Sequence, residues 1–328
     1  MSPFSETILS WYAAYGRDLP WRRTKDPYAI WLSEIILQQT RIAQGQAYWE
    51  RFLAAFPDVE ALAAAGEDEV LRLWQGLGYY SRARNLHAAA RQIVALGHFP
   101  DTLEGIRALK GVGDYTAAAI GSIAFGLPAA VVDGNVYRVL ARHYGIATPV
   151  GSTAAKKEFS ALAQALLPAE RAGDFNQGMM DFGALQCTPA APVCPLCPLA
   201  ASCAALATGA VDRLPVKEKG AAVRTRRFDY VYLRFRGRTA IRKRGPGDIW
   251  TGLYEPLVCD RRPDGACQLL KAGVKHQLTH RTLLVDFYLW EPAEAPELPA
   301  GYVWIDEAEL DRYAKPRLFE LLLESLPR

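Results

Sequence analysis

Four cysteines fall within seventeen residues of this 328-residue chain, and their spacing constrains the fold more than any other feature. Cys187, Cys194, Cys197 and Cys203 follow the pattern C-x6-C-x2-C-x5-C, with a proline after the second and the third. Free cysteines rarely gather so closely, whereas four thiolates at this spacing can converge on one metal centre, either a zinc ion or an iron-sulfur cluster. Zinc sites usually use two close pairs, and only one C-x2-C pair occurs here. The spacing therefore favours one [4Fe-4S] cluster.

The composition predicts a globular protein of about two domains. Half of the residues are hydrophobic, 22% are charged and the mean hydropathy is −0.04. No apolar run approaches the ~20 residues of a membrane span, and the first residues lack the layout of a signal peptide. We therefore expect a cytoplasmic protein without a membrane partner, in a compartment where cysteines serve as ligands rather than disulfides.

The two parts of the chain differ in predicted secondary structure. Up to residue 207, apolar residues recur with helical spacing, and a helix start is expected at Asp26-Pro27. Further helices are expected at residues 4–15, 47–56, 59–62, 67–74, 83–96, 116–125, 136–144, 154–167 and 175–185. After a linker at 208–225, strands are expected at 227–235, 239–241 and 282–290, with a last helix at 315–326. The sequence thus predicts an all-α domain at 1–207 and an α+β domain at 226–328.

The charges are also unevenly distributed. Up to Pro215 there are 18 Lys and Arg against 19 Asp and Glu, and from Val216 there are 20 against 16. Lys217 to Arg244 alone holds eleven basic residues and two acidic ones. Such a run fits a solvated linker and strand as well as a surface facing phosphates, and charge alone leaves both open.

A glycine-containing turn indicates a phosphate-binding hairpin. Lys110 is followed by Gly111, Val112 and Gly113, between a predicted helix end and the predicted helix at 116–125. The glycines permit left-handed or tight backbone, and the following helix presents free amides to an anion. An ordinary turn between helices remains the alternative, although it does not explain both glycines.

Two carboxylates have unusual neighbours. Glu34 is flanked at helical spacing by Ile30, Trp31 and Leu37, which predicts partial desolvation, a raised pKa and a role as general acid. Asp133 follows an apolar run at a helix start. The alternatives are a helix N-cap for Asp133 and a surface acid or salt-bridge partner for Glu34. Two carboxylates around an N-glycosidic bond could protonate the leaving base and face the positive charge that develops on the sugar.

The combined motifs resemble those of the MutY-type adenine DNA glycosylases, within the endonuclease III superfamily. Besides the hairpin and the four cysteines, the matching segments are LPWR (19–22), WLSE (31–34), LQQT (37–40), GLGYYSRARNL (76–86), VDGNV (132–136), NQ (176–177), MD (180–181), WTGLY (250–254) and LTH (278–280). The resemblance implies a multidomain fold. An all-α helix-hairpin-helix core would contain a six-helix barrel module (20–130) and an iron-sulfur module (1–19 and 131–207). An α+β Nudix-like domain (226–328) would follow.

The resemblance also implies a task and a partner. Members of the family bind double-stranded DNA and remove adenine mispaired with 8-oxoguanine, and we expect guanine to be accepted opposite adenine too. The adenine is flipped out of the duplex and an abasic site remains. A monomer associated with the nucleoid and carrying one [4Fe-4S] cluster is expected; the sequence does not identify protein partners.

Residue roles carry over by matching position. Glu34 would protonate adenine N7 and later activate water, and Asp133 would stabilise the oxocarbenium ion or form a transient acetal, supported by Tyr115 and Asn135. The remaining matched positions are pocket residues Arg17, Trp21, Arg22, Leu37 and Asp181, base-stack residues Gln39 and Tyr79, and hairpin residues Gly111, Val112 and Gly113.

Two positions refine the expectation. Bifunctional relatives carry a Schiff-base lysine two residues past the second hairpin glycine; Tyr115 stands there, so a monofunctional glycosylase is expected. Many members read 8-oxoguanine with a Phe-Ser-His loop, whereas this chain has Leu278, Thr279 and His280. The aromatic face is lost, so lesion discrimination there should be weaker or differently distributed.

The Nudix-like domain lacks an acid-rich catalytic helix and is expected to be a binding module. An endonuclease III-like pyrimidine glycosylase/lyase and a non-catalytic iron-sulfur DNA sensor are the alternatives.

Overall fold

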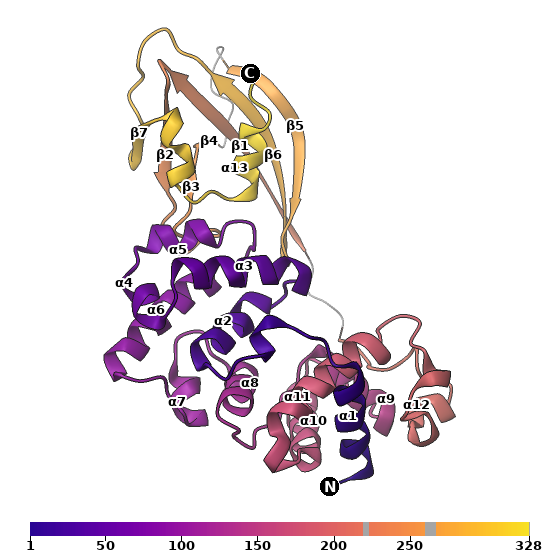
Figure 1. Ribbon diagram of the computed structural model, residues 1–328. Helices are drawn as coiled ribbons and strands as arrows, with labels where there is room; N and C mark the ends of the chain where they lie inside the picture. Colours follow the sequence, from indigo (N-terminus) through magenta and orange to yellow (C-terminus); the bar gives the residue numbers. More distant parts are fainter. Residues whose placement is uncertain (219–222, 260–266, 328) are drawn as a thin grey trace. The chain divides into compact units, whose positions relative to one another are not determined.

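The computed structural model describes residues 1–218, 223–259 and 267–327, and it divides into two compact units (Figure 1). The first unit comprises Met1–Glu60 and Ala88–Lys219, and the second comprises Ala61–His87 and Gly220–Arg328. Residues 61–87 thus group with the C-terminal part, although the sequence assigned them to the first domain. Residues 219–222 of the predicted linker lie outside the described residues. The predicted boundaries stay a prediction.

The described part of the chain before residue 208 is helical, as the sequence predicted. The helices are α1 (Pro3–Tyr15), α2 (Pro27–Leu37), α3 (Ile42–Ala55), α4 (Val59–Ala64), α5 (Glu67–Leu73), α6 (Ser81–Leu96), α7 (Leu103–Ala108), α8 (Asp114–Ala124), α9 (Gly134–Tyr144), α10 (Thr153–Leu166), α11 (Ala172–Asp181) and α12 (Ala204–Ala207). Helix α12 and the 3-10 turn η1 (Pro20–Arg22) were not predicted, and of α7 only its end before the glycine turn was. One or two turns are too short to show an apolar period. Within the described ranges, none of the helices combines the length and apolarity that crossing a bilayer requires.

Local sequence signals set the ends of two helices that matter for the site. Asp26 caps α2, because its carboxylate accepts hydrogen bonds from the amides of Tyr28 (3.1 Å) and Ala29 (3.3 Å). Pro27 occupies the first turn, where a missing N–H is tolerated. The helix predicted at 175–185 instead ends at Asp181 and continues as a π-helical turn, Phe182–Gln186.

The N-terminal helix packs against helices from the end of the first unit. Ile8, Leu140, Phe159, Phe175 and Met179 belong to one buried core. At Gly178 a Cβ atom would lie only 3.0 Å from the Tyr12 Cβ and 3.1 Å from the Ile8 Cγ2, so α1 and α11 approach closely there. The contact brings together segments separated by more than 150 residues, and Cys187, Cys197 and Cys203 pack against the same core.

The C-terminal residues form a mixed seven-stranded sheet within the described ranges. The strands are β1 (Arg224–Phe235), β2 (Arg238–Lys243), β3 (Tyr254–Glu255), β4 (Leu257–Cys259), β5 (Cys267–Gln277), β6 (Arg281–Trp290) and β7 (Tyr302–Asp306). The order is β3-β2-β1-β6-β5, with β1 parallel to β6, β4 beside β1 and β7 beside β2.

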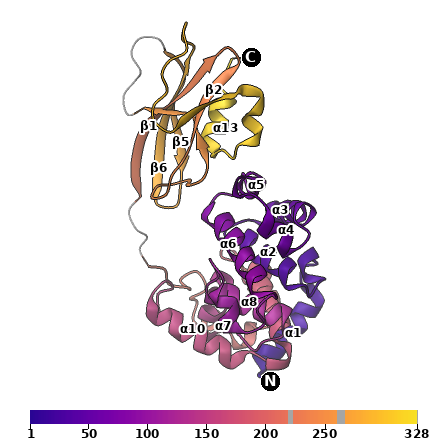
Figure 2. The same ribbon diagram turned by 90° about the vertical axis from the view of Figure 1, so that its left-hand side faces the viewer.

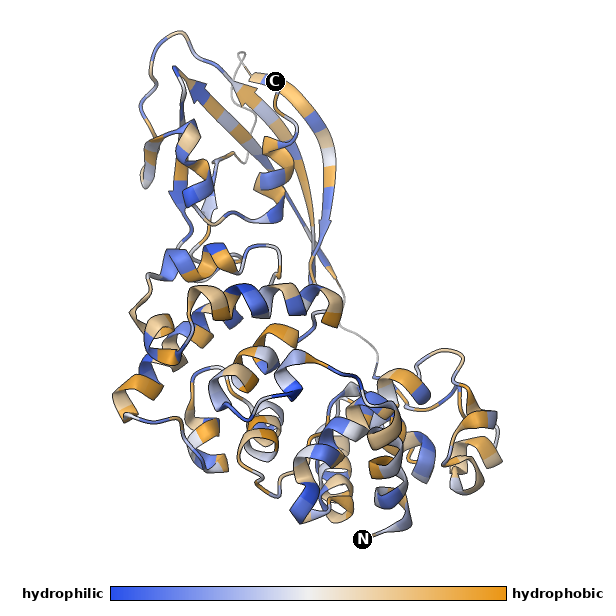
Figure 3. Cartoon of the chain, in the orientation of Figure 1, coloured by the Kyte–Doolittle hydropathy of each residue, from blue (hydrophilic) through white to orange (hydrophobic). Residues whose placement is uncertain are grey.

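Both faces of the sheet are covered, and helix α13 (Arg317–Leu323) packs on one of them (Figure 2). Along β1, Tyr230 and Tyr232 contribute to the core shared with α13, whereas Val231 and Leu233 belong to a second core on the opposite face. Hydropathy accordingly varies along the strands (Figure 3). The predicted strands are confirmed as β1, β2 and β6, whereas β3, β4, β5 and β7 were not predicted. In β5 polar and apolar residues are mixed and most are exposed, and hydrogen-bonded pairing with β6 defines the strand.

Candidate active site

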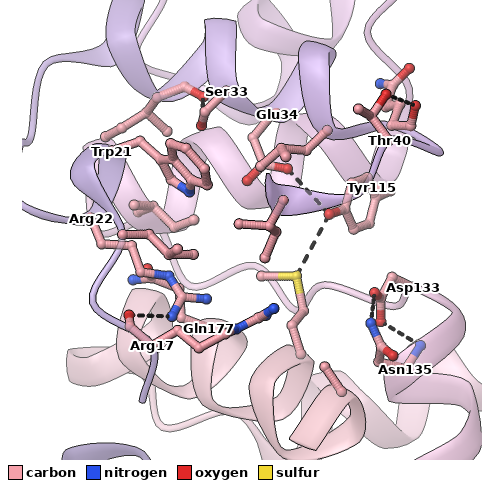
Figure 4. Close-up of a pocket in the computed structure, with 18 of the residues that line it drawn as sticks. Arg17, Trp21, Arg22, Ser33, Glu34, Thr40, Tyr115, Asp133, Asn135 and Gln177 are labelled. Carbon is pink, nitrogen blue, oxygen red and sulfur yellow. Dashed lines mark hydrogen bonds between the residues drawn. The ribbon is translucent and has the colours of Figure 1, made fainter. Parts of the chain in front are cut away.

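A pocket of about 660 Å³ opens in the first unit, within the size range of small-molecule sites (Figure 4). Helix α2 supplies Ile30, Ser33, Glu34 and Leu37 to its lining. Trp31, grouped with Glu34 by the sequence pattern, is fully buried and does not line the pocket. Trp31 is thus an apolar neighbour of Glu34, as the sequence pattern predicted, although it contributes to the core and not to the pocket lining.

Glu34 is the partly buried acid that the sequence predicted. Burial raises its pKa to about 7; the Asp133 charge acts in the same direction, whereas the Tyr115 hydrogen bond and Arg22 lower the pKa. The Tyr115 hydroxyl donates to the Glu34 Oε2 at 3.2 Å. Burial also raises the pKa of Tyr115 well above its ordinary value, so this hydroxyl remains a donor. At neutral pH, Glu34 therefore exists in both protonation states and can give or take a proton.

Asp133 lines the same pocket and also caps a helix, so the N-cap interpretation is confirmed and its catalytic role stays a prediction. Its Oδ1 accepts from the amides of Asn135 (2.9 Å) and Val136 (2.8 Å) at the start of α9. Its Oδ2 accepts from the Asn135 side-chain amide at 2.8 Å. Burial raises the pKa of Asp133, and these hydrogen bonds oppose the increase. Figure 4 shows Glu34 and Asp133 reaching the pocket from different elements.

A hydrogen-bonded arginine connects Asp133 to the cysteine-bearing segment. Arg138 donates to the Asn135 Oδ1 at 2.8 Å and to the carbonyls of Cys187 (2.7 Å) and Gly183 (2.5 Å). A Cβ on Gly183 would lie 2.6 Å from the Asn135 Cβ, so the two backbones approach closely. The orientation of Asn135 therefore depends on both α9 and the π-helical turn.

Asp181 does not line the pocket, contrary to its predicted place. Its carboxylate is fully buried behind two arginines that do line the pocket, Arg17 and Arg22. Arg22 donates to it at 2.6 and 2.9 Å, and Arg17 donates through its Nε and its backbone amide, both at 2.8 Å. Burial would raise the pKa of Asp181, but the arginines outweigh this and hold it below its ordinary value. Asp181 therefore fixes the two guanidinium groups as a buried anion.

The structure adds Gln177, which sequence reasoning matched to the family but did not assign to the site. Gln177 is 6% exposed and lines the pocket. Its Oε1 finds no hydrogen-bond partner among the residues that the structure describes. A buried acceptor without a donor is uncommon, so this atom is available to a ligand.

The other predicted residues fall in two places. The structure brings together in the pocket Arg17, Trp21, Arg22, Glu34, Leu37, Gln39, Tyr115, Asp133 and Asn135. Tyr79 and the turn formed by Leu278, Thr279 and His280 belong to the second unit. There the Tyr79 hydroxyl and the Thr279 Oγ1 share a hydrogen bond. Gln39 and Tyr79 both adopt left-handed backbone (φ 56° and 45°), a conformation that residues other than glycine rarely occupy.

The hairpin joins α7 to α8 and matches the predicted position. Gly111 adopts left-handed backbone (φ 79°), whereas Gly113 is extended and caps α8, so only the first glycine is required by its conformation. A Cβ at Gly113 would meet nothing within 4 Å, which leaves open space beside the first-turn amides of α8. Asp114, not singled out by the sequence, forms exposed ion pairs with Lys156 and Arg107 at this position.

The four cysteines lie between the π-helical turn and α12. Burial raises the pKa of the Cys197 thiol, and the charges of the three other cysteines act in the same direction. Arg142 donates to the Cys187 Sγ, and its carbonyl accepts from the Cys203 Sγ, both at 3.5 Å. In the described part of the chain, no three His, Cys, Asp or Glu side chains form a metal-ion group. Four soft thiol donors beside a guanidinium nevertheless fit the chemistry of an anionic iron-sulfur cluster.

Comparisons with known proteins identify the family. Residues 32–167 match the HhH-GPD superfamily of base excision DNA repair proteins, and residues 230–325 match the NUDIX domain. The adenine DNA glycosylase of Buchnera aphidicola subsp. Acyrthosiphon pisum is 35% identical over 254 residues, covering 76% of this chain and 73% of that protein. The chain belongs to the adenine DNA glycosylase family. The predicted resemblance and fold class are thereby confirmed.

Further comparisons cover a smaller share of this adenine DNA glycosylase family member. The human adenine DNA glycosylase is 46% identical over 200 residues, covering 58% of this chain. The chain spans 37% of that human protein's length. A thermostable thymine-DNA glycosylase structure is 32% identical, with a TM-score of 0.57 over 62% of this chain and 95% of that one. A trapped endonuclease III–DNA covalent intermediate, 22% identical with a TM-score of 0.54, covers 62% and 94% and shows the fold alone.

The geometry predicts how the Glu34 pKa responds to its hydrogen bond. Replacing Tyr115 by Phe removes the donor that favours the carboxylate, so the Glu34 pKa should rise above about 7. An NMR titration of carbon-labelled glutamate carboxyls would measure this shift. Tyr137→Phe, on α9, serves as the control and should leave the Glu34 titration unchanged. A Glu34 pKa that falls in Tyr115→Phe would contradict the arrangement.

Proposed function

We propose that the protein hydrolyses the N-glycosidic bond of adenine in double-stranded DNA, where adenine is mispaired with 8-oxoguanine or guanine, and leaves an abasic site. One observation carries the proposal: Glu34 and Asp133 line a single pocket, and the Glu34 pKa is raised to about 7. The relatives named adenine DNA glycosylase support the choice of base. A non-catalytic DNA sensor would have no need of an acid poised in this way.

The proposed reaction follows from the different surroundings of the Glu34 and Asp133 carboxyl groups. Adenine inside a duplex is inaccessible, so the nucleotide must first be flipped into the pocket. Protonated Glu34 then gives its proton to adenine N7, the bond between C1′ and N9 breaks, and adenine leaves with the bonding electrons. Asp133, held anionic by three donors from α9, faces the resulting sugar cation or adds to it transiently. Glu34, now a carboxylate, accepts a proton from the water that attacks C1′.

The lining of the pocket suits a purine. Trp21 and Leu37 offer apolar surface, and Arg17 and Arg22 are immobilised by the buried Asp181 carboxylate. The unpartnered Gln177 Oε1 would accept a hydrogen bond from the 6-amino group of adenine. Purines without that amino group would leave this buried acceptor unsatisfied, which penalises their binding.

The nature of residue 115 supports hydrolysis without strand cleavage. A lyase needs a neutral primary amine at the sugar carbon, and no lysine is present in the described lining of the pocket. Tyr115 occupies the position of the lyase lysine and keeps its proton. This disfavours the endonuclease III-like pyrimidine glycosylase/lyase as the alternative.

The DNA outside the pocket would be held at three places. The open space at Gly113 and the amides of α8 suit a phosphate. Gln39 and Tyr79 would enter the base stack, and the turn of Leu278, Thr279 and His280 would read the base opposite adenine. In this proposal the Nudix-like residues 226–328 act as a binding module and residues 1–207 as the catalytic domain.

One [4Fe-4S] cluster would be held by Cys187, Cys194, Cys197 and Cys203. Within the protein, such a cluster orders the loop that its ligands define. Arg142, which contacts Cys187 and Cys203 and donates to the carbonyls of Thr188 and Pro189, would hold that loop to α9. The proposed role is structural.

Excision tests the central proposal. A duplex with adenine opposite 8-oxoguanine should release free adenine under single-turnover conditions, and Glu34→Gln should abolish release because the amide cannot protonate N7. Glu158→Gln, on the exposed face of α10, is the matched control and should retain the wild-type rate. The rate should fall as pH rises above about 7, because protonated Glu34 is lost. An intact mismatch with the wild-type protein would refute the function.

Strand cleavage is tested separately by borohydride trapping. Because the described pocket offers no lysine, the protein should release adenine yet form no covalent complex with DNA in the presence of borohydride. A bifunctional glycosylase provides the positive control under the same conditions. An efficient covalent complex would show that a lysine reaches the abasic sugar and would overturn the monofunctional assignment.

Metal analysis tests the cluster. The purified protein should contain roughly four irons per chain and show the visible absorbance of an iron-sulfur cluster. Cys197→Ser should lose most of the iron, whereas Cys259→Ser, at the end of β4, should retain it. Stoichiometric zinc without iron in the anaerobically purified protein would contradict the assignment.

A further inference from the structure

The loop that carries Tyr79 is held in an unfavourable backbone conformation. Gly76 (φ 98°), Gly78 (φ 70°) and Tyr79 (φ 45°) are all left-handed, and the loop leads directly into α6. A bulky residue such as tyrosine rarely adopts left-handed backbone, because its Cβ then lies too close to the main chain. The ring is nevertheless 45% exposed, so burial of Tyr79 itself does not account for its conformation. Other contacts must stabilise this loop.

Arg82, in the first turn of α6, makes contacts that suit this purpose. Its side chain turns back under the loop, and its Nη2 donates to the carbonyls of Leu77 (3.2 Å) and Gly78 (3.4 Å). Its guanidinium carbon lies 5.0 Å from the Trp74 ring centroid and 5.6 Å from that of Tyr79. The cation therefore contacts the two residues that precede Tyr79, the ring itself and the tryptophan behind it.

Arg82 is only 9% exposed. Burial lowers its pKa to about 10, so the guanidinium still carries its charge at neutral pH. Burying a cation costs free energy, which carbonyl acceptors and aromatic faces offset here. A planar guanidinium can donate in its plane while its face lies against rings, whereas an ammonium cannot do both.

We propose that Arg82 is a positioning residue for Tyr79. It fixes the left-handed loop and presents the tyrosine ring outward for insertion between bases. The inference rests on the proposed function, in which Tyr79 enters the base stack. The Tyr79 hydroxyl is hydrogen-bonded to Thr279, so the ring is held at its face by Arg82 and at its tip by the turn that would read the lesion. Arg82 thereby sets the position from which Tyr79 reaches DNA.

Insertion can be measured without base release. In a Glu34→Gln background, binding to a duplex with 2-aminopurine beside 8-oxoguanine should raise the fluorescence as the stack opens. At saturating protein, Arg82→Lys and Arg82→Gln should reduce this rise severalfold, and Arg91→Lys, on the exposed face of α6, should not change it. An undiminished rise in both Arg82 variants would overturn the proposal.

A double-mutant cycle separates positioning from general stability. With Glu34 present, Arg82→Lys should slow single-turnover adenine excision about tenfold, the effect of losing about 1.4 kcal/mol in the transition state. In a Tyr79→Ala background, the same substitution should change the rate less than twofold, because there is no ring left to position. An equal loss in both backgrounds would show that Arg82 acts independently of Tyr79 and would overturn the inference. Fluorescence opening without adenine release would instead refute the proposed function and leave the role of Arg82 standing.

Discussion

The partial burial of the Glu34 carboxyl is the constraint on which the rest of the site depends. Taking a carboxylate away from water raises its pKa, and here the pKa reaches about 7 although Tyr115 and Arg22 favour the charged form. Helix α2 creates this environment because it is buried on nearly every face, and the pocket opens only along the side that carries Glu34. A more hydrated carboxyl at this position would be ionised and unable to donate a proton at neutral pH.

Each charged group around Glu34 is stabilised by an opposite charge or by hydrogen-bond donors of its own. Asp181 neutralises Arg17 and Arg22 from behind, and the amides at the start of α9 stabilise Asp133. Burial of Asp133 raises its pKa, and the hydrogen bonds from α9 oppose that rise beside a second acid. Hydrogen bonds also connect this site to the cysteine segment, because Arg138 donates both to Asn135 and to the Cys187 carbonyl. The pocket that contains Glu34 and Asp133 and the proposed cluster loop thus share one hydrogen-bond network.

Several features could be predicted because they depend on neighbours in the chain. Capping of α2 by Asp26, the hairpin between α7 and α8 and the start of α9 at Asp133 all follow from local backbone chemistry. Strand β5 could not be predicted, because its exposed side chains carry no alternating pattern and its pairing with β6 supplies the hydrogen bonds. Asp181 was placed wrongly since a carboxylate behind two arginines and one beside them look alike in sequence.

The sequence by itself determined which chemical groups are available and where helices begin, since those properties reside in residues close together along the chain. It also determined the family, because the motifs occur in order from LPWR to LTH. Only the tertiary structure decided that Glu34, Asp133 and Gln177 share one pocket, and that Arg82 donates to the backbone of the loop before Tyr79. The physical reason is that desolvation and hydrogen-bond satisfaction depend on which distant segments exclude water from a group, which residue spacing does not specify.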